Sequence, residues 1–218
     1  MRKLTALLFA AMLVASPVMA KYFPDTLVLD GTQSLQFPPD NRMTLRNGAT
    51  IEFWVQPDWT GDPGYDPVIL SNAGPEGPSY LVSLLRGRDG IGVMSGDKSD
   101  VAAFDFTDGR MHHVAIIDDG SSILVLVDNK AIGRFNMTFH PLPSAGFWIG
   151  SADGEHALFK GAIAGLRIWD VAVAPHDIES YAMTDIMNDK THVHPDLPWL
   201  VGLSDFKNKD FILQDYAQ

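Results

Sequence analysis

The chain has 218 residues, no cysteine and a formal net charge of −11, and each of these properties excludes a class of protein. Without cysteine there is neither a disulfide framework nor a cysteine nucleophile, so packing must stabilise the fold. An acidic surface repels phosphate backbones, so we expect no nucleic-acid partner. Most of the acidic residues are Asp, which favours turns, and only four are Glu, which favours helices. The composition therefore favours strands joined by turns.

Residues 1–20 have the organisation of a secretory signal peptide. Arg2 and Lys3 precede an apolar run at 4–14, and Val18 and Ala20 supply the small residues that signal peptidase requires. The run is shorter than the roughly 20 residues that a membrane-spanning helix needs. We expect cleavage after Ala20 and export to the periplasm or the medium. We expect no transmembrane anchor in the mature chain.

Short apolar or β-branched runs then recur between clusters of Gly, Pro, Asp and Asn. This spacing, without alternating helices, is typical of an antiparallel sandwich or barrel. The predicted strands are 26–29, 50–56, 68–70, 80–85, 91–94, 101–106, 112–117, 123–127, 131–135, 147–150 and 161–170.

Strand 50–56 alternates clearly, with Ile51, Phe53 and Val55 on one face and polar residues and Trp54 on the other. Further along, Pro at the first turn and apolar residues at spacing four predict one helix, from Pro175 to about Met187. A polar hinge at 191–196 precedes two returning strands, 199–206 and 211–216. We therefore expect one domain, residues 21–218, with its core at about 27–180 and the helix and returning strands at 175–218.

Three stretches in order resemble the laminin G-like family of concanavalin A-like jelly rolls, close to the pentraxin type of bacterial exported proteins. They are GATIEFWVQPDW (48–59), HHVA (112–115) with the hairpin LVLVDNKAIG (124–133), and FWIGSADGEHALFKGAIAGLRIWDVAVAPHDI (147–178). The resemblance implies an all-β fold: an antiparallel two-sheet jelly-roll sandwich with one short C-terminal helix.

The chain departs from the family pattern at three positions. Met111 stands where such strands usually open with Trp, and Ala174 replaces the usual Ser cap. Asn129 replaces a turn glycine, but Asn tolerates the left-handed conformation, so we expect the turn to form.

No catalytic motif is present. Glycoside hydrolases of this fold place two carboxylates on one strand facing the sugar cleft. Glu52 is the only Glu inside a predicted strand, and no carboxylate stands at 50, 54 or 56. We therefore expect no enzymatic activity and no catalytic residue.

Two pairs of histidines could suggest a metal site. His112 and His113 are neighbours on a strand, so they point to opposite faces and cannot share a first-shell site without a bulge. His192 and His194 are two apart and could both bind a metal, but no third ligand is identifiable, and a solvated hinge is the simpler interpretation.

The resemblance also implies a structural Ca²⁺ where the first and last strands meet. Asp30 and Asp215 are the positions that correspond, and carboxylate oxygens suit calcium. The alternative is that Asp30 and Gly31 simply form a turn. Calcium is the only cofactor that we expect.

The loop at 58–66 is the predicted ligand-binding site. Aromatic rings that stack on a sugar and carboxylates that bond its hydroxyls occur together there. The candidate residues are Asp58, Trp59, Asp62, Tyr65 and Asp66. Alternatively, the aromatic residues close the end of the core. Rival loops are 72–80 with Tyr80 and 151–159 with His156.

These observations predict an exported, non-catalytic module that binds a carbohydrate or another cell-surface ligand. A structural, assembly or adhesion protein of the cell envelope is the alternative, with a protein partner in place of a glycan. A polysaccharide-active enzyme is the third hypothesis, and the missing carboxylate pair argues against it.

Overall fold

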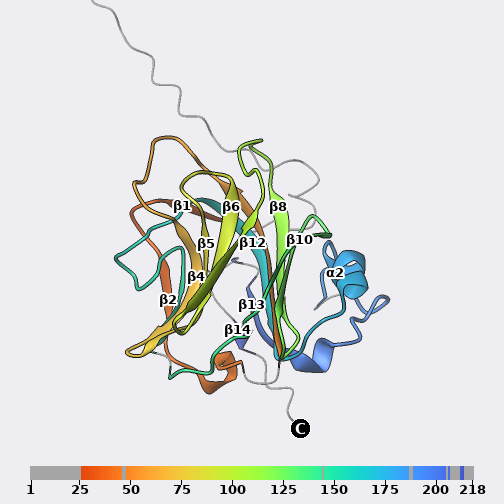
Figure 1. Cartoon of the computed structure of the whole chain (residues 1–218). Helices are drawn as coiled ribbons and strands as arrows, with labels where there is room; N and C mark the ends of the chain where they lie inside the picture. The colour runs from red at the N-terminus through yellow and green to blue at the C-terminus, as the bar shows by residue number, and fades with distance from the viewer. Residues whose placement is uncertain are drawn as a thin grey trace, which may run out of the picture.

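The computed structural model describes residues 26–45, 48–143, 145–186, 189–204, 206 and 212–213. They form two antiparallel β-sheets that face each other, and helix α2 (Pro175–Tyr181) lies outside one of them (Figure 1). The predicted two-sheet sandwich with one short helix is confirmed. The predicted signal peptide lies outside the described residues. Among the described residues, no helix is long and apolar enough to cross a membrane.

The larger sheet has eight strands within the described residues. Its middle consists of β8 (His112–Asp118), β3 (Ala49–Pro57) and β12 (Lys160–Trp169), paired in that order. The outer strands are β10 (Lys130–Phe135) and β9 (Ile123–Val127) beside β8, and β1 (Leu27–Asp30), β13 (Leu200–Ser204) and β14 (Ile212–Leu213) beyond β12.

The smaller sheet has six strands in the same part of the chain. In order, they are β2 (Leu35–Phe37), β11 (Gly146–Ile149), β4 (Val68–Gly74), β5 (Gly77–Leu84), β6 (Gly90–Ser95) and β7 (Lys98–Ala103). Each predicted strand overlaps an observed one. The prediction missed β2, because a strand of three residues is too short to show alternation.

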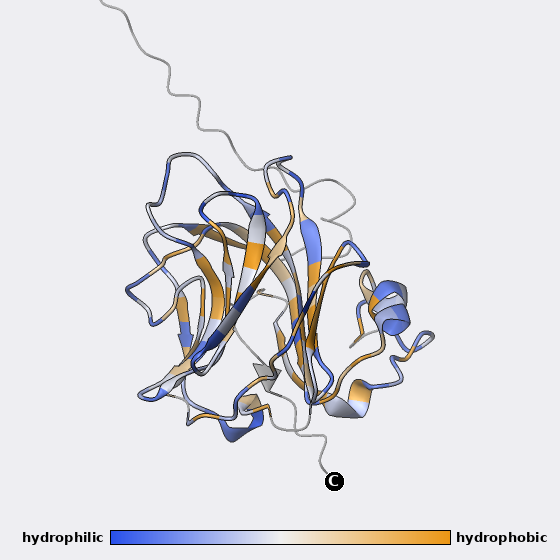
Figure 2. Ribbon diagram, viewed as in Figure 1, coloured by the Kyte–Doolittle hydropathy of each residue, from blue (hydrophilic) through white to orange (hydrophobic). Residues whose placement is uncertain are grey.

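The main hydrophobic core lies between the two sheets. Ile51, Phe53 and Val55 of β3 are fully buried in it, as their alternation predicts. Full burial of such a side chain contributes about 1.5–3 kcal/mol, so this strand anchors the sandwich. Hydrophobic residues are concentrated on the strands, and the connecting loops are mainly hydrophilic (Figure 2).

A second hydrophobic cluster lies on the outer face of the larger sheet, under α2. Ile178 of α2 and Ile186 pack there against Trp169 of β12 and Leu200 of β13. For this reason the polar side of β3, including Glu52, is buried rather than solvated.

Helix α2 is shorter than predicted, because it ends at Tyr181. The backbone carbonyls that follow are bound by sheet side chains: Trp54 donates to Ala182, and Arg167 donates to Thr184. The chain then forms a turn instead of a further helical turn, and Met187 lies outside the described residues. A short 3₁₀ helix, η2 (Leu197–Trp199), leads into β13, one of the two predicted returning strands.

Candidate ligand-binding site

The predicted loop lines a pocket at one end of the sandwich. β12 pairs with both β1 and β3, and its first residue, Lys160, lies opposite Asp30. The loop that follows β3 therefore lies beside the end of β1. The pocket has a volume of about 180 Å³ and is lined by Asp30, Gly31, Asp58, Trp59, Thr60, Gly61, Asp62, Pro63, Tyr65, Pro67, Leu158 and Lys160.

Lys160 supplies the positive charge of this pocket, and no signal in the loop sequence could have identified it. Its ammonium lies 3.1 Å from Asp58 and also donates to the hydroxyl of Thr60. Burial raises the pKa of Asp58, but hydrogen bonds from Thr60 and Lys160 outweigh burial and lower the pKa below its ordinary value. Asp58 therefore stays ionised and holds Lys160 in place.

Trp59 closes the end of the core as much as it faces the pocket. Its indole N–H donates to the carbonyl of Phe106 at 3.0 Å, and its ring packs against the main core. The guanidinium of Arg88 lies 5.5 Å from the ring centroid and donates to the carbonyl of Trp59. The indole N–H of Trp59 is already bonded and Arg88 lies over its ring. Trp59 therefore fits the alternative prediction, in which the aromatic residues of this loop close the end of the core.

Tyr65 is the aromatic side chain that the pocket presents to solvent. It is 39% exposed, and its hydroxyl donates to the carbonyl of Leu158 at 3.2 Å, which fixes the ring beside the pocket. Asp62 lies on the same loop and accepts the backbone N–H of Gly64 through one oxygen. A fixed, exposed ring near a carboxylate and an ammonium suits a ligand that is apolar on one face and carries hydroxyls.

Asp66 does not line the pocket. It accepts the backbone N–H of Arg86 at 2.7 Å, and the Arg86 guanidinium donates to the carbonyl of Gly64. Asp66 thus connects two neighbouring loops, and four of the five predicted ligand-binding residues meet at the pocket.

The structural Ca²⁺ expected at Asp30 and Asp215 stays a prediction, because the structure describes only the surroundings of Asp30. One oxygen of Asp30 accepts both the N–H and the hydroxyl of Thr32, which closes the turn at Gly31, where φ is +86°. The strand register places Lys160 opposite Asp30, and hydrogen bonds from Thr32 together with the charge of Lys160 lower the pKa of Asp30. Asp215 lies outside the described residues, among which no group of three or more acidic, His or Cys side chains could hold a metal.

His112 and His113 lie on opposite faces of β8, as predicted. His112 is buried between Asp108 and Asp128, whose carboxylate oxygens lie 2.9 and 2.8 Å from its ring nitrogens. Burial lowers the pKa of His112, but these two hydrogen bonds outweigh burial and raise the pKa above its ordinary value. His113 instead contacts Glu52 at 3.0 Å on the outer face.

Glu52 is the centre of a buried polar network that the sequence did not reveal. Besides His113, it accepts from the indole N–H of Trp169 at 3.1 Å and from Arg167 at 3.3 Å. Burial raises the pKa of Glu52, but Arg167 and the hydrogen bond from His113 outweigh burial and lower the pKa to about 2. A general acid of glycoside hydrolysis needs a raised pKa, so Glu52 has a structural role.

His192 and His194 do not form a metal pair, and the prediction of a solvated hinge is wrong for His194. Its ring is buried against Trp169 and Tyr181, with centroid distances of 4.4 and 4.5 Å. His192 is exposed and contacts Asp189. The hydrophobic cluster under α2 extends to His194. The polar residues at 191–196 gave no indication of this burial in the sequence.

The two rival loops offer less. Tyr80 is fully buried in the main core and cannot contact a ligand. His156 is exposed and bonded to Asp153 within its own turn. The loop after β3 therefore remains the best candidate among the three.

Two stacked antiparallel sheets of this topology define a jelly-roll sandwich. A family model of the concanavalin A-like lectin/glucanases superfamily matches residues 29–179, and the chain belongs to this family. No curated protein is similar enough in sequence to match the chain.

Three solved structures illustrate the shared fold. A native heptameric SAP-like pentraxin from Limulus polyphemus is 14% identical, with a TM-score of 0.59 over 87% of this chain and 91% of its own. Domain 4 of an extracellular arabinanase from Geobacillus stearothermophilus, solved with arabinotriose, is 19% identical, with a TM-score of 0.56 over 72% and 76%. The CBM40 domain of a Ruminococcus gnavus sialidase, bound to α2,3-sialyllactose, is 9% identical, with a TM-score of 0.56 over 72% and 95%. These similarities concern the fold.

Proposed function

We propose that this protein is an exported, non-catalytic module that binds a carbohydrate at the pocket after β3. The observation that carries the proposal is the exposed ring of Tyr65, which lines the same pocket as Asp62 and Lys160 and is bonded to the carbonyl of Leu158. A sugar ring has an apolar face that stacks on an aromatic ring and hydroxyls that bond to charged side chains. The arabinotriose and sialyllactose complexes of two fold neighbours support this class of ligand.

The charges support binding rather than catalysis. Asp58 is held ionised beside Lys160, and the pKa of the buried Glu52 is lowered, so neither carboxyl is prepared to donate a proton. Export rests on the signal-peptide pattern of residues 1–20, with cleavage after Ala20. The ligand would then be a glycan of the envelope or of the surroundings.

An adhesion or assembly role is the second candidate, and a different surface favours it. Trp199 and Val193 are 54% and 57% exposed, and both lie in the segment that leads into β13. Exposed aromatic residues are enriched where proteins meet. This candidate predicts that the wild type binds a protein partner and no glycan, and that Trp199→Ser no longer binds this partner.

The proposed site is tested by a pair of variants at one position. Tyr65→Ala removes the stacking ring, whereas Tyr65→Phe keeps the ring and removes only the hydroxyl. We expect Tyr65→Ala to weaken glycan binding about tenfold, because stacking contributes about 1.5 kcal/mol, and Tyr65→Phe to bind nearly as well as the wild type. Calorimetry with the best ligand from a glycan array measures both. Equal binding by all three proteins would place the site elsewhere.

A further inference from the structure

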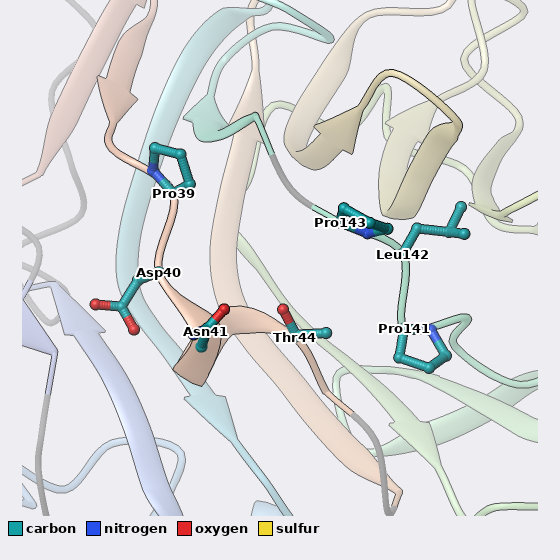
Figure 3. A pocket seen from close by; sticks show the side chains of 7 residues that line it. All are labelled: Pro39, Asp40, Asn41, Thr44, Pro141, Leu142 and Pro143. Carbon is teal, nitrogen blue, oxygen red and sulfur yellow. The ribbon is translucent and has the colours of Figure 1, made fainter.

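A larger pocket lies at the opposite end of the sandwich. β3 begins near this pocket and ends at the loop that carries Tyr65. Two segments face each other across the pocket, one before β3 and one between β10 and β11 (Figure 3). Its volume is about 530 Å³, which is within the range of small-molecule sites, and it is lined by Pro39, Asp40, Asn41, Thr44, Pro141, Leu142 and Pro143.

The one ionisable side chain among these seven residues is already neutralised. Asp40 binds Arg42, which donates its backbone N–H and two guanidinium N–H groups at 2.9, 2.9 and 2.7 Å. The carboxylate of Asp40 also points away from the 141–143 segment (Figure 3). Among the described lining residues the pocket therefore offers no free charge to a ligand, which favours a neutral one.

Two polar side chains are available on one wall. Asn41 and Thr44 lie in and just after the 3₁₀ helix η1 (Asn41–Met43), and neither side chain has a hydrogen-bond partner among the residues that the structure describes. Together they supply an amide and a hydroxyl, which both donate and accept hydrogen bonds. The opposite wall is apolar, with the rings of Pro141 and Pro143 and the side chain of Leu142 (Figure 3).

An extended peptide suits these walls poorly. Peptide recognition along an extended chain uses rows of backbone N–H and C=O groups. Three of the seven lining residues are prolines, which have no backbone N–H. A compact ligand with one apolar face and several hydroxyls matches one polar and one apolar wall better.

We infer that this pocket is a second, independent binding site, and that its ligand is a neutral sugar ring. The hydroxyls of the sugar bond to Asn41 and Thr44, and its apolar face lies against the prolines and Leu142. The nine residues of β3 separate the two sites by about 30 Å, at about 3.3 Å per residue. One protein molecule then connects two glycan chains, or two parts of the same glycan chain.

The test is a titration of the isotope-labelled wild-type protein with maltotriose, cellotriose and arabinotriose, followed by amide NMR. We expect at least one trisaccharide to shift the side-chain amide of Asn41 and the backbone amides of residues 40–44 and of Leu142. Thr44→Val keeps the shape and removes the hydroxyl, and Asn41→Ala removes the amide. Each variant should weaken binding at this pocket about fivefold, the effect of one lost hydrogen bond.

The matched control is Asn136→Ala, because Asn136 is exposed and does not line the pocket. It should bind like the wild type, and melting curves should confirm that all variants are folded. Shifts confined to 58–67 would overturn the second site and leave the proposed function intact. No shifts at residues 40–44 and Leu142 with any of the three trisaccharides would overturn the second site, whereas the proposed function is decided separately by the Tyr65 variants. If a proline-rich peptide shifts residues 40–44 and the sugars do not, the proposal of a sugar site is overturned in favour of a peptide site.

Discussion

At the scale of single residues, the most consequential side chain is one that contacts no ligand pocket. Glu52 accepts hydrogen bonds from His113, Trp169 and Arg167 in a fully buried position. Arg167 in turn donates to the carbonyls of Tyr181 and Thr184, just after α2. A single carboxylate thus connects β3, β8, β12 and the segment that covers them.

We expect Glu52→Gln to lower the free energy of unfolding by about 3 kcal/mol. The substitution leaves the charge of Arg167 buried without its counter-ion, which is the costly way to break a buried ion pair. Urea denaturation measures the loss, and Glu155→Gln, at an exposed position, is the control. A variant as stable as the wild type would contradict the role of this network.

The pH dependence of Glu52 has a definite direction. Its pKa is about 2 in the folded state and above 4 in an unfolded chain, so its contribution is complete above about pH 4.5 and is lost as the pH falls towards 2. Glu52→Gln should therefore lose little stability at the acid end of that range.

His112 should show the opposite dependence. Its pKa is raised above the ordinary value of about 6.5, so its contribution is complete below that pH and is lost as the pH rises through the raised value. A titration of the imidazole by NMR should give a midpoint above 6.5 in the wild type and a lower one in Asp128→Asn. A wild-type midpoint below 6.5 would show that burial, rather than the two carboxylates, controls this histidine.

At the scale of elements, α2 begins without a side-chain cap. Ala174 has the extended conformation of a capping residue (φ −65°, ψ 138°), but no side-chain hydrogen bond closes the first turn. Ala174→Ser should raise the free energy of unfolding by about 0.5–1 kcal/mol, because the hydroxyl can accept an N–H of the first turn. Thermal melting of this variant beside Ala131→Ser, an exposed strand position, measures the gain. An unchanged midpoint would show that tertiary contacts alone hold the helix.

The strands were predictable from the local sequence pattern. The packing of α2 and the following segment over the larger sheet was not. The alternation at 50–56 correctly placed Ile51, Phe53 and Val55 on one face of the strand, and this face lies in the core. The pattern gave no sign that Glu52 is buried, because its partner Arg167 is 115 residues away. Similarly, Asn129 adopts the expected left-handed turn (φ 63°), whereas the early end of α2 depends on contacts with the sheet.

At the scale of the whole molecule, the two pockets lie at opposite ends of a sandwich that carries a formal net charge of −11. Four residues of the first pocket were predictable because they are neighbours in sequence. Lys160 joins them through strand pairing 100 residues away, and the second pocket unites segments that no sequence motif connects. The acidic surface favours neutral glycans over polyanions as ligands.

The most direct test of the central claim is affinity electrophoresis of the mature protein in gels that contain neutral polysaccharides, with an assay of reducing ends on the same mixtures. A non-catalytic binding module should be retarded by at least one polysaccharide, less so as Tyr65→Ala, and should release no reducing ends. Unretarded migration in every gel, or release of reducing ends by the wild type, would contradict the account.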